Sequence, residues 1–233
     1  MGKTCKAPES IKGFPQDAID QLGQKIEDFA EDTIFHDYTF FVGINPTIST
    51  FPSRASDGTQ YFRDATGINT QLFIAFLATN NPNVNVQALS IQALMAGGGI
   101  KNPDWMIHRK VAQDFEFYEV KPKSSSGTRE GNKKLLFFAP FFALNNLPYT
   151  PGIKYNPQDR EEIMWIETKG FFETTITLRW SRTLPGLIQY DVCVETRLRQ
   201  PGRVKVKNPF DAVTLALLLM IWLGIELAPA AAI

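Results

Sequence analysis

Two acidic residues and a lysine stand at spacings that suit metal-assisted hydrolysis. Asp104 follows Pro103, and further along the chain Glu119 and Lys121 lie two residues apart in the segment 118–122. Residues i and i+2 of a β-strand point to the same face, so Glu119 and Lys121 are expected to project side by side. Two carboxylates and an ammonium at one point are what a hard divalent cation and an activated water require. The pattern therefore predicts a site for cation-assisted hydrolysis.

The residues around these side chains predict a β-hairpin. Residues 114–121 alternate and are rich in aromatic side chains, which is typical of a strand, and residues 105–110 are predicted to be its partner. In this hairpin Asp104 is expected to end near Glu119. The face of Glu119 also carries Phe115, Phe117 and Lys121, and the other face carries Glu116, Tyr118 and Val120.

The combination of Pro103-Asp104 with Glu119-x-Lys121 resembles the PD-(D/E)xK nuclease superfamily. The resemblance implies that Asp104 and Glu119 hold Mg²⁺, for which Mn²⁺ is a substitute, together with the backbone carbonyl of Val120. Lys121 would then orient or deprotonate the attacking water and stabilise charge on the phosphate. Such an ion lowers the pKa of its water and neutralises the charge that develops on a phosphodiester. The implied fold is α/β, with a restriction-endonuclease-like mixed central sheet flanked by helices.

Superfamily members commonly place a further acid on a helix before the hairpin. Residues 14–32 predict an amphipathic helix, because apolar side chains at spacings of three and four form one stripe. Glu27 or Glu31 would supply the additional acid, and the alternative is an ordinary acid on the solvent side of a surface helix. The apolar stripe consists of Ile19, Leu22, Ile26 and Phe29.

The region before the hairpin predicts two further helices, over 68–79 and 84–96. The glycines at 97–99 are not followed by Lys-Ser or Lys-Thr, so a helix stop is favoured over a phosphate-binding loop. Residues 38–43 predict a short strand, and 46–61 predict a loop.

A polar and basic segment, 122–134, follows the Glu-x-Lys strand and leads into a predicted helix over 131–146. Some superfamily members carry Gln or Tyr near the site on this helix; Gln is missing here, and Asn132 or Lys133 is the expected substitute. The composition of 122–134 suits phosphate contacts and equally a plain flexible loop. The candidate nucleic-acid contacts are Lys123, Ser125, Arg129, Lys133 and Lys134.

Beyond this helix, residues 171–181 and 187–197 predict a strand pair joined by a turn at 183–186. Residues 161–168 predict either a strand or a short helix. The arginines of this part would form a basic face along nucleic acid or simply solubilise an edge hairpin. They are Arg179, Arg182, Arg197, Arg199 and Arg203.

The charge is unevenly distributed although the net charge is zero. Residues 1–100 carry 6 Lys and Arg against 10 Asp and Glu, whereas residues 101–207 carry 18 against 12. The basic excess falls on the segment of the predicted site, which favours a nucleic-acid partner.

Residues 212–225 are apolar or nearly so, but the run is shorter than the ~20 residues of a membrane span. A packed or partner-binding helix is therefore favoured, and membrane contact of 212–233 is the alternative. The expected regions are a helical part at 1–99, a nuclease-like core at 100–207, completed by helices within 14–96, and an apolar helix at 208–233.

Cys5 and Cys193 lie far apart and form no metal-binding spacing, so a reducing compartment is expected rather than a disulfide scaffold. Residues 1–13 lack the apolar core of a secretory signal. The expected location is cytoplasmic, or the cytoplasm of a target cell for a delivered effector. Two histidines are too few for a histidine-rich zinc site.

The predicted function is Mg²⁺-dependent hydrolysis of phosphodiester bonds, with DNA favoured over RNA. Residues 100–160 look like the nuclease domains of bacterial polymorphic toxins and secretion-system effectors, which implies an immunity protein and a delivery machinery as partners. One alternative is a non-catalytic binding module or membrane-anchored adaptor on a degenerate nuclease fold. The other is a structure-specific nuclease of repair or of a mobile element.

Overall fold

Strand β4, Asp114–Pro122, pairs with a neighbour along each of its edges and connects the two parts of a mixed sheet. It pairs antiparallel with β3, Trp105–Arg109, and parallel with the first residues of β8, Leu187–Leu198. The strand order is β2-β3-β4-β8-β7-β6, with β1 beside β8 and β5 beside β4. The structure is a computed structural model that describes residues 3–7, 16–45, 51–64, 70–89, 102–169 and 171–198.

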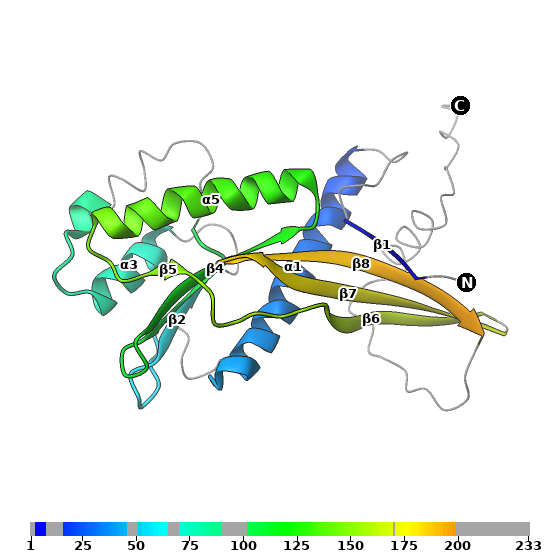
Figure 1. Cartoon of the computed structure of the whole chain (residues 1–233), viewed down its shortest axis with the longest axis horizontal. Helices are drawn as coiled ribbons and strands as arrows, with labels where there is room; N and C mark the ends of the chain where they lie inside the picture. The colour runs from blue at the N-terminus through cyan, green and yellow to red at the C-terminus, as the bar shows by residue number, and fades with distance from the viewer. Residues whose placement is uncertain are drawn as a thin grey trace.

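Three long strands form an arm that extends beyond the helices (Figure 1). β6, Arg160–Lys169, and β7, Phe172–Leu184, pair antiparallel, and β7 pairs antiparallel with β8. The turn between β7 and β8 contains Gly186 at a φ of 75°, a left-handed conformation that glycine adopts without steric cost. The predicted strand pair and its turn are thus confirmed, and residues 161–168 are a strand and not a helix.

Helix α1, Gln16–Val42, covers one face of the sheet. Its buried side chains recur every four residues and pack against the strands, which explains why this long segment is helical. The members of this stripe are Leu22, Ile26, Ala30, Ile34 and Tyr38.

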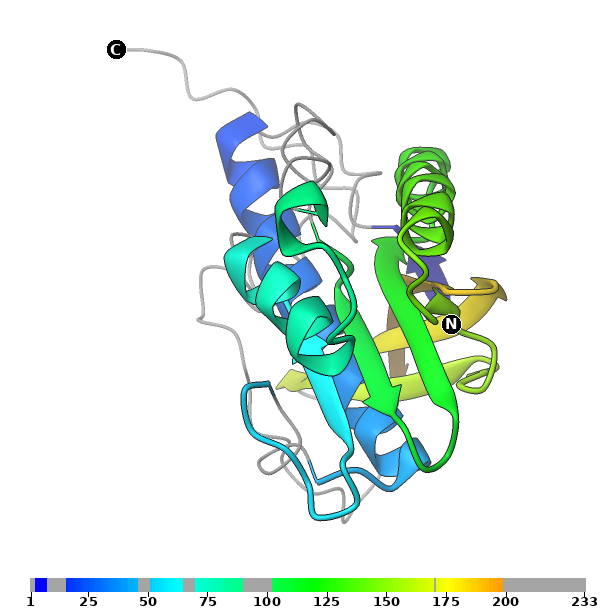
Figure 2. The same cartoon turned by 90° about the vertical axis from the view of Figure 1, so that its left-hand side faces the viewer.

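Helices α3, Thr70–Asn80, and α5, Ser125–Leu144, cover the opposite face. Phenylalanines from both helices and from the sheet form this second core, with ring centroids of Phe117 and Phe142 5.2 Å apart. Figure 2 shows α1 and α5 on the two sides of the sheet. The observed class is therefore mixed α/β, with a curled mixed sheet between helices.

The segment 38–43 was predicted as a strand, and this is wrong, because these residues are the last turns of α1 and the residue after it. Phe35 and Tyr38 continue the helical stripe, and their rings meet Trp105 at centroid distances of 5.6 and 5.5 Å. The aromatic content of the segment favours a strand, but Tyr38 and Phe41 stand three residues apart, which is a helical spacing.

The boundaries of other elements also differ from the predictions. α5 begins at Ser125, within the predicted polar loop, because the Ser124 side chain accepts the Gly127 N–H at 2.9 Å and caps the helix. Strand β2, Gln60–Arg63, begins in a segment predicted as loop. Two short strands, β1, Thr4–Lys6, and β5, Thr150–Pro151, were not predicted.

Cys5 and Cys193 form a disulfide, which contradicts the expectation of a reducing compartment without a disulfide scaffold. β1 pairs antiparallel with β8, and its register sets Cys5 directly opposite Cys193. The pairing brings together residues 188 positions apart in sequence, and the spacing of the cysteines gives no sign of it.

Several predictions concern residues that the structure does not describe: residues 90–96 of the second predicted helix, the glycines at 97–99, and the apolar helix at 208–233. Residues 86–89 are helical. No helix within the described part of the chain is long and apolar enough to cross a membrane.

Candidate functional site

Asp104 closes the open end of the β3–β4 hairpin. The strand register ends with Trp105 opposite Tyr118, so Val120 has no residue of β3 opposite it. Asp104 Oδ2 accepts the Val120 N–H at 2.6 Å in place of a strand partner. Pro103, the preceding residue, has no N–H to donate to the Val120 carbonyl. The Pro-Asp pair therefore ends the strand ladder and holds a buried carboxylate at the same point.

Lys134 of α5 joins Asp104 to Glu119. Its Nζ donates to Glu119 Oε2 at 2.6 Å, to Asp104 Oδ1 at 3.2 Å and to the Asn102 carbonyl at 3.2 Å. These acceptors match the three N–H groups of an ammonium. The two carboxylates that were expected to converge thus meet at one cationic group, and Glu119 is fully buried.

The sequence predicts Lys134 as a contact to nucleic acid and gives no prediction of its position between the two acids. Gly127, Gly131, Lys134 and Phe138 stand at spacings of four, three and four, so they share the face of α5 that packs on the sheet. A Cβ on Gly131 would lie 2.5 Å from Leu187 Cδ1, which shows how closely the helix approaches. A lysine on the helix face that packs on the sheet is the feature of the sequence that could have predicted a charged group at this position.

Lys121 lies beside the two acids and is paired with α1. Its Nζ donates to Glu27 Oε1 at 3.0 Å, and only 11% of its side chain is exposed. Glu31 follows Glu27 by four residues, hence on the same face of α1, and it interacts electrostatically with Asp104 and Lys121. Both candidate additional acids thus lie at the cluster, one of them in an ion pair.

Burial and neighbouring charges perturb the two central acids in opposite directions. Burial, followed by the charge of Asp104, raises the pKa of Glu119 to about 8. Burial alone would also raise the pKa of Asp104, but Lys134, Lys121 and the Val120 N–H outweigh it and lower the pKa below its usual value. At neutral pH Asp104 is therefore ionised, whereas Glu119 binds a proton for much of the time.

The remaining groups of the cluster are perturbed as well. Burial, then the charges of Asp104 and Glu27, raises the pKa of Glu31 to about 9. Burial opposes the charged form of Lys121 and Lys134, but the surrounding carboxylates more than compensate and raise both lysine pKa values. Perturbed acids and bases that gather at one place are typical of functional sites.

The donor set of the cluster fits a hard divalent cation. Glu119 Oε1 is buried and has no hydrogen-bond partner among the described residues, so one carboxylate oxygen is available to a ligand. Two carboxylates that converge on one positive group match the one or two carboxylates by which proteins commonly bind Mg²⁺.

A second group of potential ligands does not fit a metal. Cys5, Asp191 and Cys193 form the only set of three His, Cys, Asp or Glu side chains in the described ranges whose ligand atoms lie within 4.8 Å. Its two sulfurs are bonded to each other in the disulfide, so neither offers a thiolate.

The predicted nucleic-acid contacts separate into two groups. Lys123, Ser125, Arg129 and Lys133 are exposed on or beside the first half of α5, whereas Lys134 is part of the charge cluster and only 13% of its side chain is exposed. Lys133, an expected substitute for the superfamily's Gln, is thus exposed to solvent.

The arginines of the β7–β8 pair have partners within the protein. Arg179 forms a bidentate pair with Asp191 at 3.0 and 2.6 Å, and Arg197 pairs with Glu173 at 3.3 Å. Arg182 donates to the carbonyl of Ile153 and, at 3.3 Å, to that of Tyr155. This finding favours the structural alternative for these three residues; Arg199 and Arg203 lie outside the described ranges.

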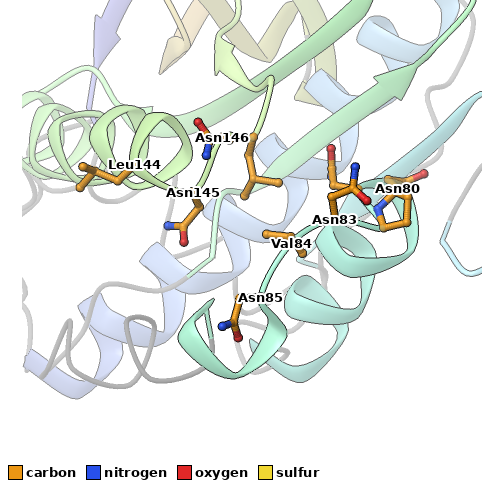
Figure 3. A pocket seen from close by; sticks show the side chains of 10 residues that line it. Asn80, Asn83, Val84, Asn85, Leu144, Asn145 and Asn146 are labelled. Carbon is orange, nitrogen blue, oxygen red and sulfur yellow. The ribbon is translucent and has the colours of Figure 1, made fainter.

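A surface pocket of about 510 Å³ lies at the other end of α5, between its C-terminus and that of α3 (Figure 3). Its polar lining is provided by asparagines and contains no titratable side chain, so it offers neither acid–base nor carboxylate chemistry. We therefore assign the candidate site to the charge cluster. The pocket is lined by Asn80, Asn81, Pro82, Asn83, Val84, Asn85, Leu144, Asn145, Asn146 and Leu147.

Comparison of the chain with models of protein families, with curated proteins and with solved structures found no match. The class that the fold and the site define is therefore a mixed α/β protein with a buried cluster of carboxylates and lysines between β4, α1 and α5.

Proposed function

We propose that this protein is a divalent-cation-dependent nuclease of the PD-(D/E)xK type, with a restriction-endonuclease-like fold. The observation that carries the proposal is the meeting of Asp104, which directly precedes β3, and Glu119 of the adjacent strand β4 at one positive group. The buried, unpartnered Oε1 of Glu119 supports it, because such an oxygen is costly to bury without a ligand.

Asp104 and Glu119 would hold Mg²⁺ or Mn²⁺ together with the carbonyl of Val120, the residue whose N–H donates to Asp104. The bound ion would supply a water of lowered pKa and neutralise charge on the phosphate. Glu31 is the favoured additional acid, because the side chain of Glu27 is already paired with a lysine.

Lys121 would act as a cation and not as a base. Its pKa lies well above the ordinary lysine value, so the side chain stays protonated at neutral pH. We assign it to orienting the attacking water and to stabilising negative charge on the phosphate. Glu27 holds the ammonium in place from α1.

The substrate would approach over the first half of α5. Exposed Lys123, Arg129 and Lys133 provide positive charge there, and the N-terminal turn of α5 adds backbone N–H groups and the positive end of the helix dipole. DNA is favoured over RNA by the family resemblance.

The proposal is tested with purified protein and supercoiled plasmid. We expect cleavage with Mg²⁺, none with EDTA, and loss of cleavage in Lys121→Met. Lys110→Met, exposed in the turn at the other end of the hairpin, is the matched control and should cleave normally. Equal cleavage by both variants, or by the EDTA-treated enzyme, would overturn the proposal.

The proposed biological role is that of an antibacterial toxin or effector, with an immunity protein over the basic surface. Expression in bacteria should then stop growth, and Lys121→Met should restore it. Normal growth with active, folded nuclease would favour a repair or mobile-element enzyme instead.

A further inference from the structure

We infer that Lys134 is a built-in competitor of the divalent cation: its ammonium bridges Asp104 and Glu119 in the cation-free protein and must leave for an ion to bind the same two oxygens. The inference rests on the proposed function, since it concerns the regulation of the same site. The site would then hold one of two positive groups: the ammonium of the protein's own Lys134 or a divalent cation from solution.

The first argument is the completeness of the contacts of Lys134. Its Nζ lies 2.6 Å from Glu119 Oε2 and 3.2 Å from Asp104 Oδ1, and the Asn102 carbonyl takes the third N–H at 3.2 Å. Only 13% of the side chain is exposed. The ammonium is therefore seated in a built site and is not a surface lysine near two acids.

The second argument is steric and electrostatic. Lys134 Nζ lies on Asp104 Oδ1 and Glu119 Oε2, and an ion that took these two oxygens as ligands would occupy nearly the same space as the ammonium. Two positive groups at such separation repel strongly in a buried site. These two oxygens can therefore be bridged either by the ammonium or by the ion, but not by both at once.

The third argument is the difference between the two lysines. Lys121 is paired with Glu27 on α1, outside the pair of acids that Lys134 bridges. Lys121 can therefore remain in place while the ion binds, and Lys134 cannot. Lys134 is carried by α5, beside the exposed basic residues Lys133 and Arg129, so its released ammonium adds to the positive surface on that helix.

The direct test measures Mn²⁺ binding, by the electron paramagnetic resonance signal of free Mn²⁺, to the wild-type protein, Lys134→Met and Lys133→Met. We expect Lys134→Met to bind Mn²⁺ about 5- to 150-fold more tightly, the usual range for coupling between two ligands. Lys133→Met, on the same turn but exposed, should bind like the wild type.

The outcomes separate this inference from the proposed function. Unchanged or weaker binding by folded Lys134→Met, with normal wild-type binding, would overturn the competition and leave the metal site intact. Absence of Mn²⁺ binding by both proteins would overturn the metal site, and with it the inference.

A second measurement uses the unmodified sequence, in case Lys134→Met does not fold. Acetylation of lysines, followed by mass spectrometry, should label Lys134 slowly without Mg²⁺ and at least about tenfold faster with saturating Mg²⁺. Lys133 should be labelled at the same rate in both conditions and Lys121 should stay protected. Protection of Lys134 that Mg²⁺ does not change would contradict the inference.

Discussion

Two buried glutamates on β4 differ in how the protein satisfies them. Both oxygens of Glu116 have partners: Oε1 accepts the N–H groups of Ile153 and Lys154 at 2.9 and 3.2 Å, and Oε2 accepts the Tyr118 hydroxyl at 2.7 Å. Glu119 is still more deeply buried, yet its Oε1 has no partner among the described residues and its Oε2 accepts only from a lysine.

The difference indicates two roles for the same residue type on one strand. Glu116 joins the segment after β5 to the sheet, and each of its two oxygens accepts a hydrogen bond from the protein. Glu119 keeps a buried oxygen that the fold leaves unsatisfied, which is destabilising unless a ligand uses it. We therefore interpret Glu116 as structural and Glu119 as functional.

The largest expected effect is on cleavage. Glu119→Gln should lower the plasmid cleavage rate by on the order of a thousandfold, because metal-assisted charge stabilisation is worth several kcal/mol. Glu116→Gln should retain the rate per folded molecule. Similar rates in the two variants, each shown to be folded by circular dichroism, would remove the functional distinction between the two glutamates.

For the free energy of unfolding, we expect the larger loss in Glu116→Gln and the smaller loss in Glu119→Gln. Glu116→Gln sets an amide NH₂ among hydrogen-bond donors, so we expect its free energy of unfolding to fall by about 1–3 kcal/mol. Glu119→Gln removes a desolvated acid and should cost less. Urea unfolding of both variants without metal measures this difference, and a greater loss for Glu119→Gln would contradict the structural role of Glu116.

A third prediction concerns the close approach of α5, which brings Lys134 to Glu119. A Cβ on Gly127 would lie 2.2 Å from the Pro122 carbonyl oxygen, so Gly127→Ala should destabilise the protein by about 1–3 kcal/mol. Gly23→Ala is the control, because that helical glycine has open space and alanine should stabilise by about 0.4–1 kcal/mol. Chemical unfolding of both variants should show opposite signs.

The smallest expected effect is a pH dependence of the free energy of unfolding that arises from Glu119 and Glu31. The folded-state pKa values of Glu119 and Glu31 are raised, to about 8 and about 9, so the folded protein holds these protons more tightly than the unfolded chain does. Their stabilising contribution is complete below about pH 4.5 and is lost as pH rises through the raised values. Without metal, stability should therefore decline up to about pH 9.

Urea midpoints measured from pH 5 to 9 test this dependence. Glu119→Gln should have a shallower decline, and Glu116→Gln should have the slope of the wild type. Stability that rises with pH over this interval in the metal-free wild type would show that the two acids are ionised throughout.

The sequence predicted what depends on local periodicity. The hairpin, the shared face of Glu119 and Lys121, and the meeting of Asp104 with Glu119 all follow from the alternation of one strand and its short turn. The catalytic roles of these residues and the identity of the nuclease superfamily stay predictions.

Other features depend on contacts between distant segments and could not be read from the local pattern. The aromatic end of α1 is helical because Phe35 and Tyr38 pack on Trp105, far along the chain. The Cys5–Cys193 disulfide depends on a pairing of β1 with β8 that no local signal announces. The position of Lys134 is indicated in the sequence only by a charged residue on the face of α5 that packs on the sheet.

The most direct test of the account is a crystal of the wild-type protein grown with Mn²⁺ and measured for anomalous scattering. The account predicts one anomalous peak in contact with the carboxylates of Asp104 and Glu119, with the Lys134 amine moved away from both. Well-ordered density in which Lys134 still bridges the two acids at saturating Mn²⁺, with no peak beside them, would contradict it.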